Sequence, residues 1–373
     1  MNIAIIGSGL TGSLAAISLA NTGCIVDLYE RLSDEELINI NQTYVITHSS
    51  RKILEHIGIW SDLGSLLVPF QYLNVIDHEV NNYCQFLIND LNKLDQKYST
   101  VGWIAEHKLI MPSILGLISN IDNINRIPTS VIPNTNNYDL IVAADGSSSN
   151  TKKRLKTPSF DFSYNQVCLT AKVLLRGVKS NEAYVILNRE GPFEILPLGG
   201  DVFQIICNQS IAKGMYNMSL PNSLFLDYLS TVLPYGIEPD TFIDPPKSFP
   251  INFIFNYSFF SGKYIYLGET AHKLHTVGGH DLNLCWRDVE CLTKLISNPL
   301  FKKNYSLIPI TYSVLRLGDV LSISILTESL VRFSRCDLMI FALPRKIIFF
   351  ILKKSTIVRK FIHNLITNGL MHV

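Results

Sequence analysis

Apolar and polar residues follow one another over the first thirty positions in the order of a βαβ unit. An apolar run at 3–6 enters the turn Gly7-Ser8-Gly9-Leu10-Thr11-Gly12, and apolar residues then recur at helical spacing from 14 to 19. A second apolar run, at 24–29, ends in the acidic residue Glu30. This pattern predicts a strand, a glycine-rich turn, a helix and a second strand.

Each glycine of this turn has its own physical role. Gly7 permits the tight turn out of the strand, Gly9 lets a pyrophosphate approach the backbone, and Gly12 lets the helix pack closely on the sheet. The free N–H groups at the helix N-terminus attract phosphate. Glu30 suits the ribose hydroxyls and would repel a 2′-phosphate, so FAD or NAD fits better than NADP. We therefore predict a dinucleotide site; the alternative is a glycine-rich turn in an ordinary α/β protein.

The remaining pattern predicts an α/β protein with two domains. Expected helices lie at 49–60, 107–119, 224–233, 282–296 and 308–330. Expected strands lie within 70–105 and at 138–144, 167–175, 183–187, 193–198, 202–207 and 263–267, whereas 120–137 is expected to be mostly loop. We divide the chain into a discontinuous Rossmann-like domain (1–156 plus 256–330), a mostly antiparallel β-sheet substrate domain (157–255) and a basic, apolar, helical C-terminal tail (331–373).

Composition limits the kinds of binding partner and the cellular compartment that we expect for this protein. The 373 residues carry a net charge of +1, which gives no electrostatic case for nucleic acid. Seven cysteines without a C-x-x-C pair fit a reducing compartment. No basic segment precedes the first strand, and no apolar run is long enough to span a membrane. We expect a cytoplasmic protein, either free or peripheral on the inner face of the membrane.

Two further motifs stand at the ends of apolar runs. The run 139–144 ends in Asp145-Gly146, and the run 264–267 ends in Gly268-Glu269. With the first glycine turn, these motifs occur in the order of a known family. The chain resembles the flavin-dependent aromatic hydroxylases of the p-hydroxybenzoate hydroxylase fold, and within them most resembles the flavin hydroxylases of ubiquinone biosynthesis.

This resemblance implies a site for FAD spread over the three motifs. Gly7, Gly9, Gly12 and Glu30 would hold the ADP part, Asp145 and Gly146 would lie beside the pyrophosphate, and Gly268-Glu269 would contact the ribityl chain. Gln42, Thr276, Gly278, Gly279, Asp281 and the backbone through Asn283 would lie near the flavin ring. The flavin carries the chemistry, so no catalytic side chain and no metal are expected.

The resemblance also implies a reaction. Reduced flavin would react with O₂ to a C4a-hydroperoxide, which hydroxylates the ring of a lipophilic, polyprenylated phenol in quinone biosynthesis. The electron donor would be NAD(P)H or another reductant. Two alternatives stay open: a flavin-fold member of a quinone-biosynthesis complex with weak or no catalysis, and a flavoprotein monooxygenase acting on another aromatic or an isoprenoid.

Some residues depart from the family pattern. Gln42 stands at a common arginine, Glu269 replaces an aspartate, Thr276 replaces a proline and Asp281 replaces a glycine. A carboxylate of Asp281 pointing inward would oppose flavin reduction, whereas one pointing outward could cap a helix starting at Leu282. We favour the cap.

Two other features admit a structural and a functional interpretation. His272, His275 and His280 cluster near the proposed site, and we interpret them as structural residues because no acidic or cysteine ligand stands at a fitting spacing for a metal. The tail from Arg332 onward interleaves eight basic residues and one acid with apolar residues. This pattern is typical of a helix on an anionic membrane surface, and the alternative is a helix packed on the core.

Overall fold

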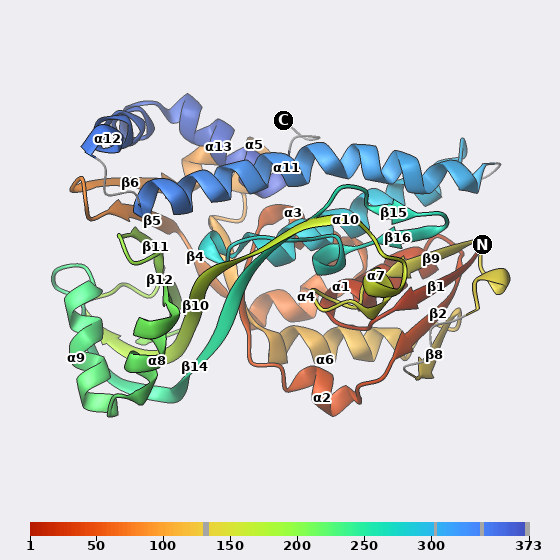
Figure 1. Ribbon diagram of the computed structural model, residues 1–373, viewed down its shortest axis with the longest axis horizontal. Coiled ribbons are helices and arrows are strands. Elements are labelled where there is room, and N and C mark those ends of the chain that lie inside the picture. The colour runs from red at the N-terminus through yellow and green to blue at the C-terminus, as the bar shows by residue number, and fades with distance from the viewer. Residues whose placement is uncertain (130–133, 302–303, 336–338, 370–373) are drawn as a thin grey trace.

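Two β-sheet lobes stand side by side, and the C-terminal helices run along one edge of both (Figure 1). The computed structural model describes residues 1–129, 134–301, 304–335 and 339–369. The edge helices are α11 (Ile308–Arg335), α12 (Met339–Lys354) and α13 (Thr356–Asn368). Within the described ranges, no helix is both long and apolar enough to cross a bilayer.

The first lobe is a six-stranded sheet in the order β15-β16-β9-β1-β2-β8, parallel from β16 to β8. Its strands are β1 (Asn2–Ile6), β2 (Ile25–Glu30), β8 (Ile124–Pro128), β9 (Leu140–Ala143), β15 (Phe260–Ser261) and β16 (Tyr264–Tyr266). Helix α1 (Leu10–Ala20) packs on β1 and β2 and against α6 (His107–Ile118) and α10 (His280–Ser297). Burial of the central strands on both faces explains their continuous apolar runs.

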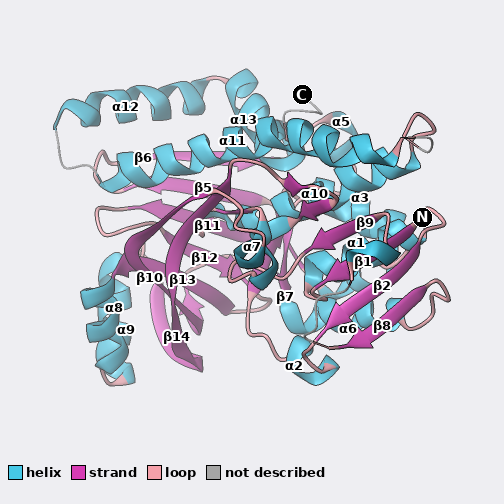
Figure 2. Ribbon diagram, turned by 45° about the vertical axis from the view of Figure 1, so that its right-hand side comes forward, coloured by secondary structure: helices cyan, strands magenta, loops and turns pink. Residues whose placement is uncertain are grey.

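The second lobe is an eight-stranded, mostly antiparallel sheet in the order β17-β14-β10-β13-β12-β11-β5-β6. Its strands are β5 (Tyr72–Asp77), β6 (Asn82–Leu87), β10 (Ser159–Arg176), β11 (Glu182–Leu187), β12 (Phe193–Pro197), β13 (Val202–Ser210), β14 (Glu238–Asn256) and β17 (His272–Lys273). Figure 2 shows the long, twisted β10 and β14, with α8 (Ile211–Ser219) and α9 (Asn222–Val232) at one end. Phe225 and Leu229 of α9 are buried in the core of this lobe.

A small antiparallel sheet, β3-β7-β4, completes the strands. It consists of β3 (Thr43–Ile46), β4 (Val68–Phe70) and β7 (Gly102–Glu106). The other helices are α2 (Asp34–Ile38), α3 (His48–His56), α4 (Trp60–Leu63), α5 (Lys93–Gln96) and α7 (Asn150–Arg154). Short 3₁₀ turns include η1 (Gly64–Leu66), η4 (Gly268–Thr270) and η5 (Val277–Gly279).

The structure corrects three local predictions. The helix expected at 49–60 is two helices, α3 and α4, because Gly58 between them adopts φ +88°, a conformation that ends helices. The expected loop 120–137 contains β8, whose side chains are mostly exposed at the sheet edge and therefore show no apolar pattern. Helix α8 was not expected.

The two sheets do not follow the predicted division of the sequence. Strands β5 and β6 come from the predicted first domain, yet they extend the second sheet through the parallel pair of β5 and β11. Helix α11 continues to Arg335, past the boundary placed after residue 330. The predicted change of texture near residue 157 coincides with the start of β10.

Candidate functional site

A pocket of about 440 Å³ lies where the two lobes meet. Its walls come from the N-terminus of α1, strand β3, the long strands β10, β13 and β14, and the segment from η4 to α10. Seven of the predicted site residues line it: Gly9, Gln42, Gly146, Glu269, Thr276, Gly279 and Asp281. Several residues between 269 and 281 and the first glycine turn, far apart in sequence, therefore line one cavity.

The glycine turn between β1 and α1 has the geometry expected of a phosphate cradle. A Cβ on Gly12 would stand 1.9 Å from the carbonyl oxygen of Gly7, and one on Gly7 would stand 2.4 Å from that of Ala144. By contrast, a Cβ on Gly9 would meet no atom within 4 Å. Gly9 is the N-cap of α1 and gives that helix no side-chain cap. Open space in front of uncapped helix N–H groups fits a pyrophosphate.

Two acids at the carboxyl ends of β2 and β9, Glu30 and Asp145, lie beside this turn and accept hydrogen bonds around it. One oxygen of Glu30 accepts the Ser8 N–H at 2.7 Å, and the other accepts two N–H groups of residues 31 and 32. Asp145 accepts the Ser149 hydroxyl at 2.6 Å and the Thr151 N–H at 3.1 Å. A carboxylate has about four acceptor sites, so each acid keeps capacity for a ribose hydroxyl or a bound water.

Glu269 lies in the pocket beside a cation that the sequence analysis missed. Lys273 Nζ stands 3.1 Å from Glu269 Oε2 and 3.4 Å from the Ser147 hydroxyl, and it also lines the pocket. The spacing of four residues gave no signal, because residues 268–273 form a 3₁₀ turn and a short strand and not a helix. Burial lowers the pKa of Lys273, but the carboxylates of Glu269 and Asp281 outweigh it, so the pKa lies above its ordinary value.

The predicted cap by Asp281 is wrong. Helix α10 begins at His280 with Gly279 as its N-cap, and Asp281 lies inside the first turn. Its carboxylate accepts the Leu274 N–H at 3.3 Å and lines the pocket. Burial and the nearby Glu269 raise the pKa of Asp281 to about 7. The αL conformation of Gly279, with φ +60°, turns the chain so that this carboxylate faces inward.

Asn283 does not line the pocket, because its side chain joins α10 to the segment after β3. Its Oδ1 accepts the Thr47 N–H and hydroxyl at 3.0 Å and the Ser50 hydroxyl at 2.7 Å. Its Nδ2 donates to the Val45 and Gly279 carbonyls at 2.6 and 3.0 Å. Asn283 thus holds the Gly279 carbonyl in place. The predicted contact of the backbone near Asn283 with the cofactor stays a prediction.

Gln42 belongs to a hydrogen-bonded row that includes Tyr44 and His107. The Tyr44 hydroxyl lies 2.6 Å from Gln42 Oε1 and 3.0 Å from His107 Nδ1, and its single proton can be donated to only one of these two acceptors at a time. His107 Nε2 donates to the Leu37 carbonyl at 2.8 Å, which leaves Nδ1 as an acceptor. Burial lowers the pKa of His107, which favours this neutral form. All three residues line the pocket; Tyr44 and His107 were not predicted, although Tyr44 stands only two residues after Gln42, at the start of β3.

The sequence analysis also missed an acid, Glu194 of β12, which holds the turn η5 through a hydrogen bond. Its Oε1 accepts the Gly278 N–H at 2.8 Å, and its Oε2 is buried without a hydrogen-bond partner. The side chain is fully buried, and burial raises its pKa to about 7. Glu194 stands among apolar residues of a predicted strand, and for this reason the sequence analysis did not single it out as a site residue.

A buried ion network holds the Gly268-Glu269 turn to α10 and α11. Asp288 accepts the Gly268 N–H at 2.9 Å, His272 Nε2–H at 2.8 Å and Arg316 Nε–H at 2.6 Å. Arg316 and Arg287 both pair with Asp319. Burial alone would raise the pKa of Asp288, but His272 and Arg316 lower it below its ordinary value.

The three histidines have separate partners. His272 bonds Asp288, and His275 Nε2 lies 3.4 Å from Gln166 Oε1. A Cβ on Gly278 would meet the ring of His280, so that ring packs against η5. Among the residues that the structure describes, no group of three His, Cys, Asp or Glu side chains could hold a metal ion.

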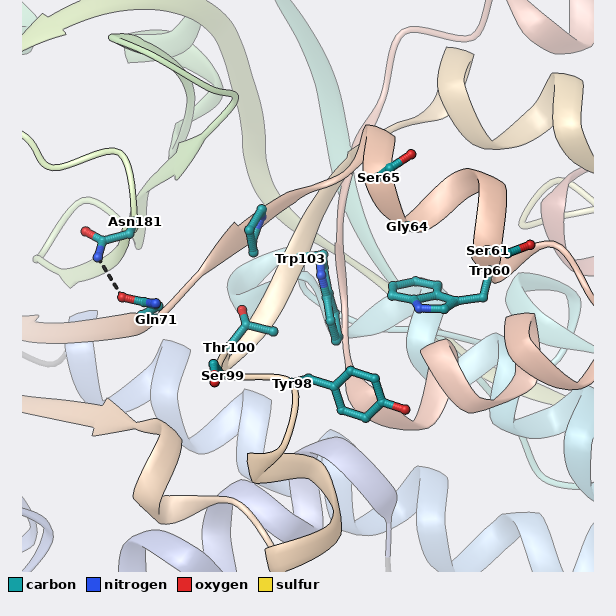
Figure 3. A pocket seen from close by; sticks show the side chains of 11 residues that line it. Trp60, Ser61, Gly64, Ser65, Gln71, Tyr98, Ser99, Thr100, Trp103 and Asn181 are labelled. Atoms are coloured by element: carbon teal, nitrogen blue, oxygen red, sulfur yellow. Dashed lines mark hydrogen bonds between the residues drawn. The ribbon is translucent and has the colours of Figure 1, made fainter.

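A second cavity, of about 590 Å³, lies apart from these residues (Figure 3). Trp60, Tyr98 and Trp103 form its aromatic wall, and the indole rings of the two tryptophans meet edge to face at 4.9 Å. None of the predicted site residues lines it.

Comparison with known proteins finds several relatives named for ubiquinone biosynthesis, together with kynurenine 3-monooxygenases. The chain is 22% identical over 376 residues to the mitochondrial ubiquinone biosynthesis monooxygenase COQ6 of Dictyostelium discoideum, covering 79% of this chain and 76% of the relative. It is 22% identical to the ubiquinone hydroxylase UbiL of Rhodospirillum rubrum, covering 93% and 84%. No family model matches the chain.

Solved structures share the fold over nearly the whole chain. The p-nitrophenol 4-monooxygenase PnpA of Pseudomonas putida superposes with a TM-score of 0.78 at 14% identity, covering 97% of this chain and 96% of that one. The R204Q variant of Klebsiella pneumoniae HpxO, solved with FAD, gives 0.75 at 16% identity, covering 100% and 99%. The predicted resemblance and fold class are confirmed, and these names agree with the predicted class of FAD-dependent monooxygenase.

Proposed function

We propose that this chain, which has the fold of the flavin-dependent aromatic hydroxylases, is an FAD-dependent monooxygenase that hydroxylates the ring of a polyprenylated phenol in quinone biosynthesis. The observation that carries the proposal is the open space at Gly9, before the uncapped N-terminus of α1, within a pocket that extends to η5. Relatives named for ubiquinone biosynthesis support the choice of substrate.

The residues present fit FAD in most respects. Gly7, Gly9 and Gly12 would hold the pyrophosphate, Glu30 the ribose, and the backbone of Gly278 and Gly279 the flavin ring. Bound FAD, reduced by NAD(P)H or another donor, would supply the transfer of one oxygen atom from O₂ to the ring. Apolar side chains of β10, β13 and β14, among them Ile206, Phe249 and Ile251, would exclude water from around a lipophilic substrate.

The first test is to record the visible spectrum of the purified protein, reduce it without oxygen and readmit air with a polyprenylated phenol. We expect bound flavin, rapid reoxidation and a hydroxylated product. In a host lacking the hydroxylase, the wild-type gene should restore quinone synthesis, whereas Gly9→Glu, which puts a side chain into the open cradle, should not. Thermal unfolding of Gly9→Glu without cofactor is the control for folding.

The second candidate is a flavin-fold member of a quinone-biosynthesis complex with weak or no catalysis. The observation that favours it is the pair of carboxylates, Glu269 and Asp281, that line the pocket. A colourless protein that takes up no FAD, yet still restores quinone synthesis beside a separate active hydroxylase, would support this candidate and contradict the monooxygenase.

We also propose that the C-terminal tail contacts an anionic membrane surface, where such a substrate resides. Arg345 and Arg359 pair with Asp77 and Asp90 and so attach α12 and α13 to the body. The tail still exposes Lys346, Lys353, Lys354 and Lys360, together with Leu343, Phe350, Ile357 and Phe361. Binding to anionic but not neutral vesicles should fall in Lys346→Glu/Lys354→Glu, and not in the control Lys153→Glu/Lys156→Glu. Equal binding by all three proteins would contradict the proposal.

A further inference from the structure

Helix α11 presents an apolar stripe to solvent. The exposed fractions of Ile310, Val314, Leu317, Leu321 and Ile325 are 50%, 68%, 38%, 45% and 59%. Their steps of four, three, four and four residues place them on one face. The opposite face is buried too, through residues such as Tyr312, Val320 and Ile323. A helix that is apolar on both faces is normally covered on both.

Charge distribution indicates what kind of surface covers the stripe. Between 308 and 327 the charged residues are Arg316 and Asp319, and both are buried and paired inside the molecule. A membrane-surface helix carries basic residues on its polar face, whereas the core of a protein interface is depleted of charge. The stripe therefore fits another protein surface better than an anionic bilayer.

The spacing of the stripe makes it complementary to itself. Reversal of the helix about the point between Leu317 and Gly318 exchanges 310 with 325 and 314 with 321. An antiparallel second copy would thus set Ile310 against Ile325 and Val314 against Leu321, with Leu317 and Gly318 at the twofold axis. A Cβ on Gly318 would meet nothing within 4 Å, so the small residue leaves room at the axis. This exchange is the requirement for an isologous interface.

The available surface is large enough for such a contact. Residues 310–325 extend over about 24 Å at ~1.5 Å per residue, and Figure 1 shows α11 running across both lobes. Together with Leu307, which is 49% exposed, the stripe side chains expose an apolar surface on the order of 500 Å² per copy. Two copies would bury roughly 1,000 Å², which is about the minimum for a biological interface and typical of a weak dimer.

We propose that this chain forms a twofold-symmetric dimer through antiparallel pairing of the α11 helices. The occupant of the stripe is a second copy of the chain, in a register centred between Leu317 and Gly318. The dimer is independent of the proposed enzymatic function, because none of the stripe residues lines the pocket between the lobes.

The mass of the full chain in solution tests the dimer. Light scattering after size exclusion should give twice the 42.0 kDa of one chain at micromolar concentration. Val314→Glu/Leu321→Glu should give one chain mass, while Leu94→Glu, a change at a side chain 76% exposed on α5, should stay dimeric. Circular dichroism should show both variants folded. A single-chain mass for the wild type would overturn the proposal.

Cysteine cross-linking tests the register. Gly318→Cys should form a disulfide with its own copy on mild oxidation, because it lies at the axis. Ile310→Cys should cross-link to Ile325→Cys in a mixture and not to itself. Cross-linking of Ile310→Cys to itself would contradict the register. A monomer whose vesicle binding is lost in Val314→Glu/Leu321→Glu would identify a bilayer as the occupant and overturn the dimer.

Discussion

Glu194→Gln should change how the stability of this protein depends on pH. The wild-type carboxyl is fully buried, one oxygen accepts the Gly278 N–H at 2.8 Å, and the other has no partner. Glutamine keeps an acceptor for Gly278 and nearly the same volume, but it cannot ionise. The variant therefore isolates the ionisation of one side chain.

The magnitude follows from the pKa difference between the folded and unfolded chains. Burial raises the pKa of Glu194 from 4.5 to about 7. A raised folded pKa gives stability that is fully present below the unfolded pKa and is lost as pH rises through the folded one. Between pH 5 and 8.5 this linkage removes about 2 to 3 kcal/mol from the free energy of unfolding of the wild type.

Urea denaturation at pH 5, 6, 7, 8 and 8.5 measures this effect. The wild type should lose about 2 to 3 kcal/mol more than Glu194→Gln over this range. Asp281, whose pKa is also raised to about 7, adds a loss of the same sign to both proteins, so it cancels in the difference. Glu238→Gln, at an exposed position of β14, should follow the wild type. Parallel curves for wild type and Glu194→Gln would refute the reasoning.

Three further predictions concern the pocket and its supports. Gly9→Ala should leave thermal unfolding unchanged but weaken FAD binding measured by visible absorbance. Gly12→Ala, whose Cβ would stand 1.9 Å from a carbonyl oxygen, should lower the free energy of unfolding by at least about 1–3 kcal/mol. Equal stability of the two variants would contradict the close approach at Gly12. At pH 8.5, where Asp281 with its pKa of about 7 is ionised, Asp281→Asn should tighten FAD binding about tenfold and raise the flavin reduction potential, since it removes a negative charge worth on the order of 1–2 kcal/mol. Titration and potentiometry giving no change at this pH would show that the carboxyl does not face the flavin. Arg316→Met should cost about 3–5 kcal/mol in urea denaturation, because Asp288 and Asp319 are buried and each loses one of its charged partners. A cost below about 1 kcal/mol would show that the network is not needed for stability.

The sequence by itself determined the features that depend on local order. The turn at Gly7, Gly9 and Gly12 and the strands beside it follow from neighbouring residues, since steric limits act over a few positions. The Asp145-Gly146 and Gly268-Glu269 turns were recognised for the same reason, because each follows directly on a buried run. The match to known folds confirms the architecture that these motifs predicted.

Tertiary structure alone decided what faces the pocket. No local pattern reveals that β5 pairs with β11, or that Glu194 contacts η5, because these contacts join residues about a hundred positions apart. The inward orientation of Asp281 depends on the αL turn at Gly279, which Asn283 holds through a hydrogen bond. Local propensity favoured a cap there, and packing against β3 and β12 prevailed. Side-chain direction at a turn is set by the whole fold, and so is the charge inside this pocket.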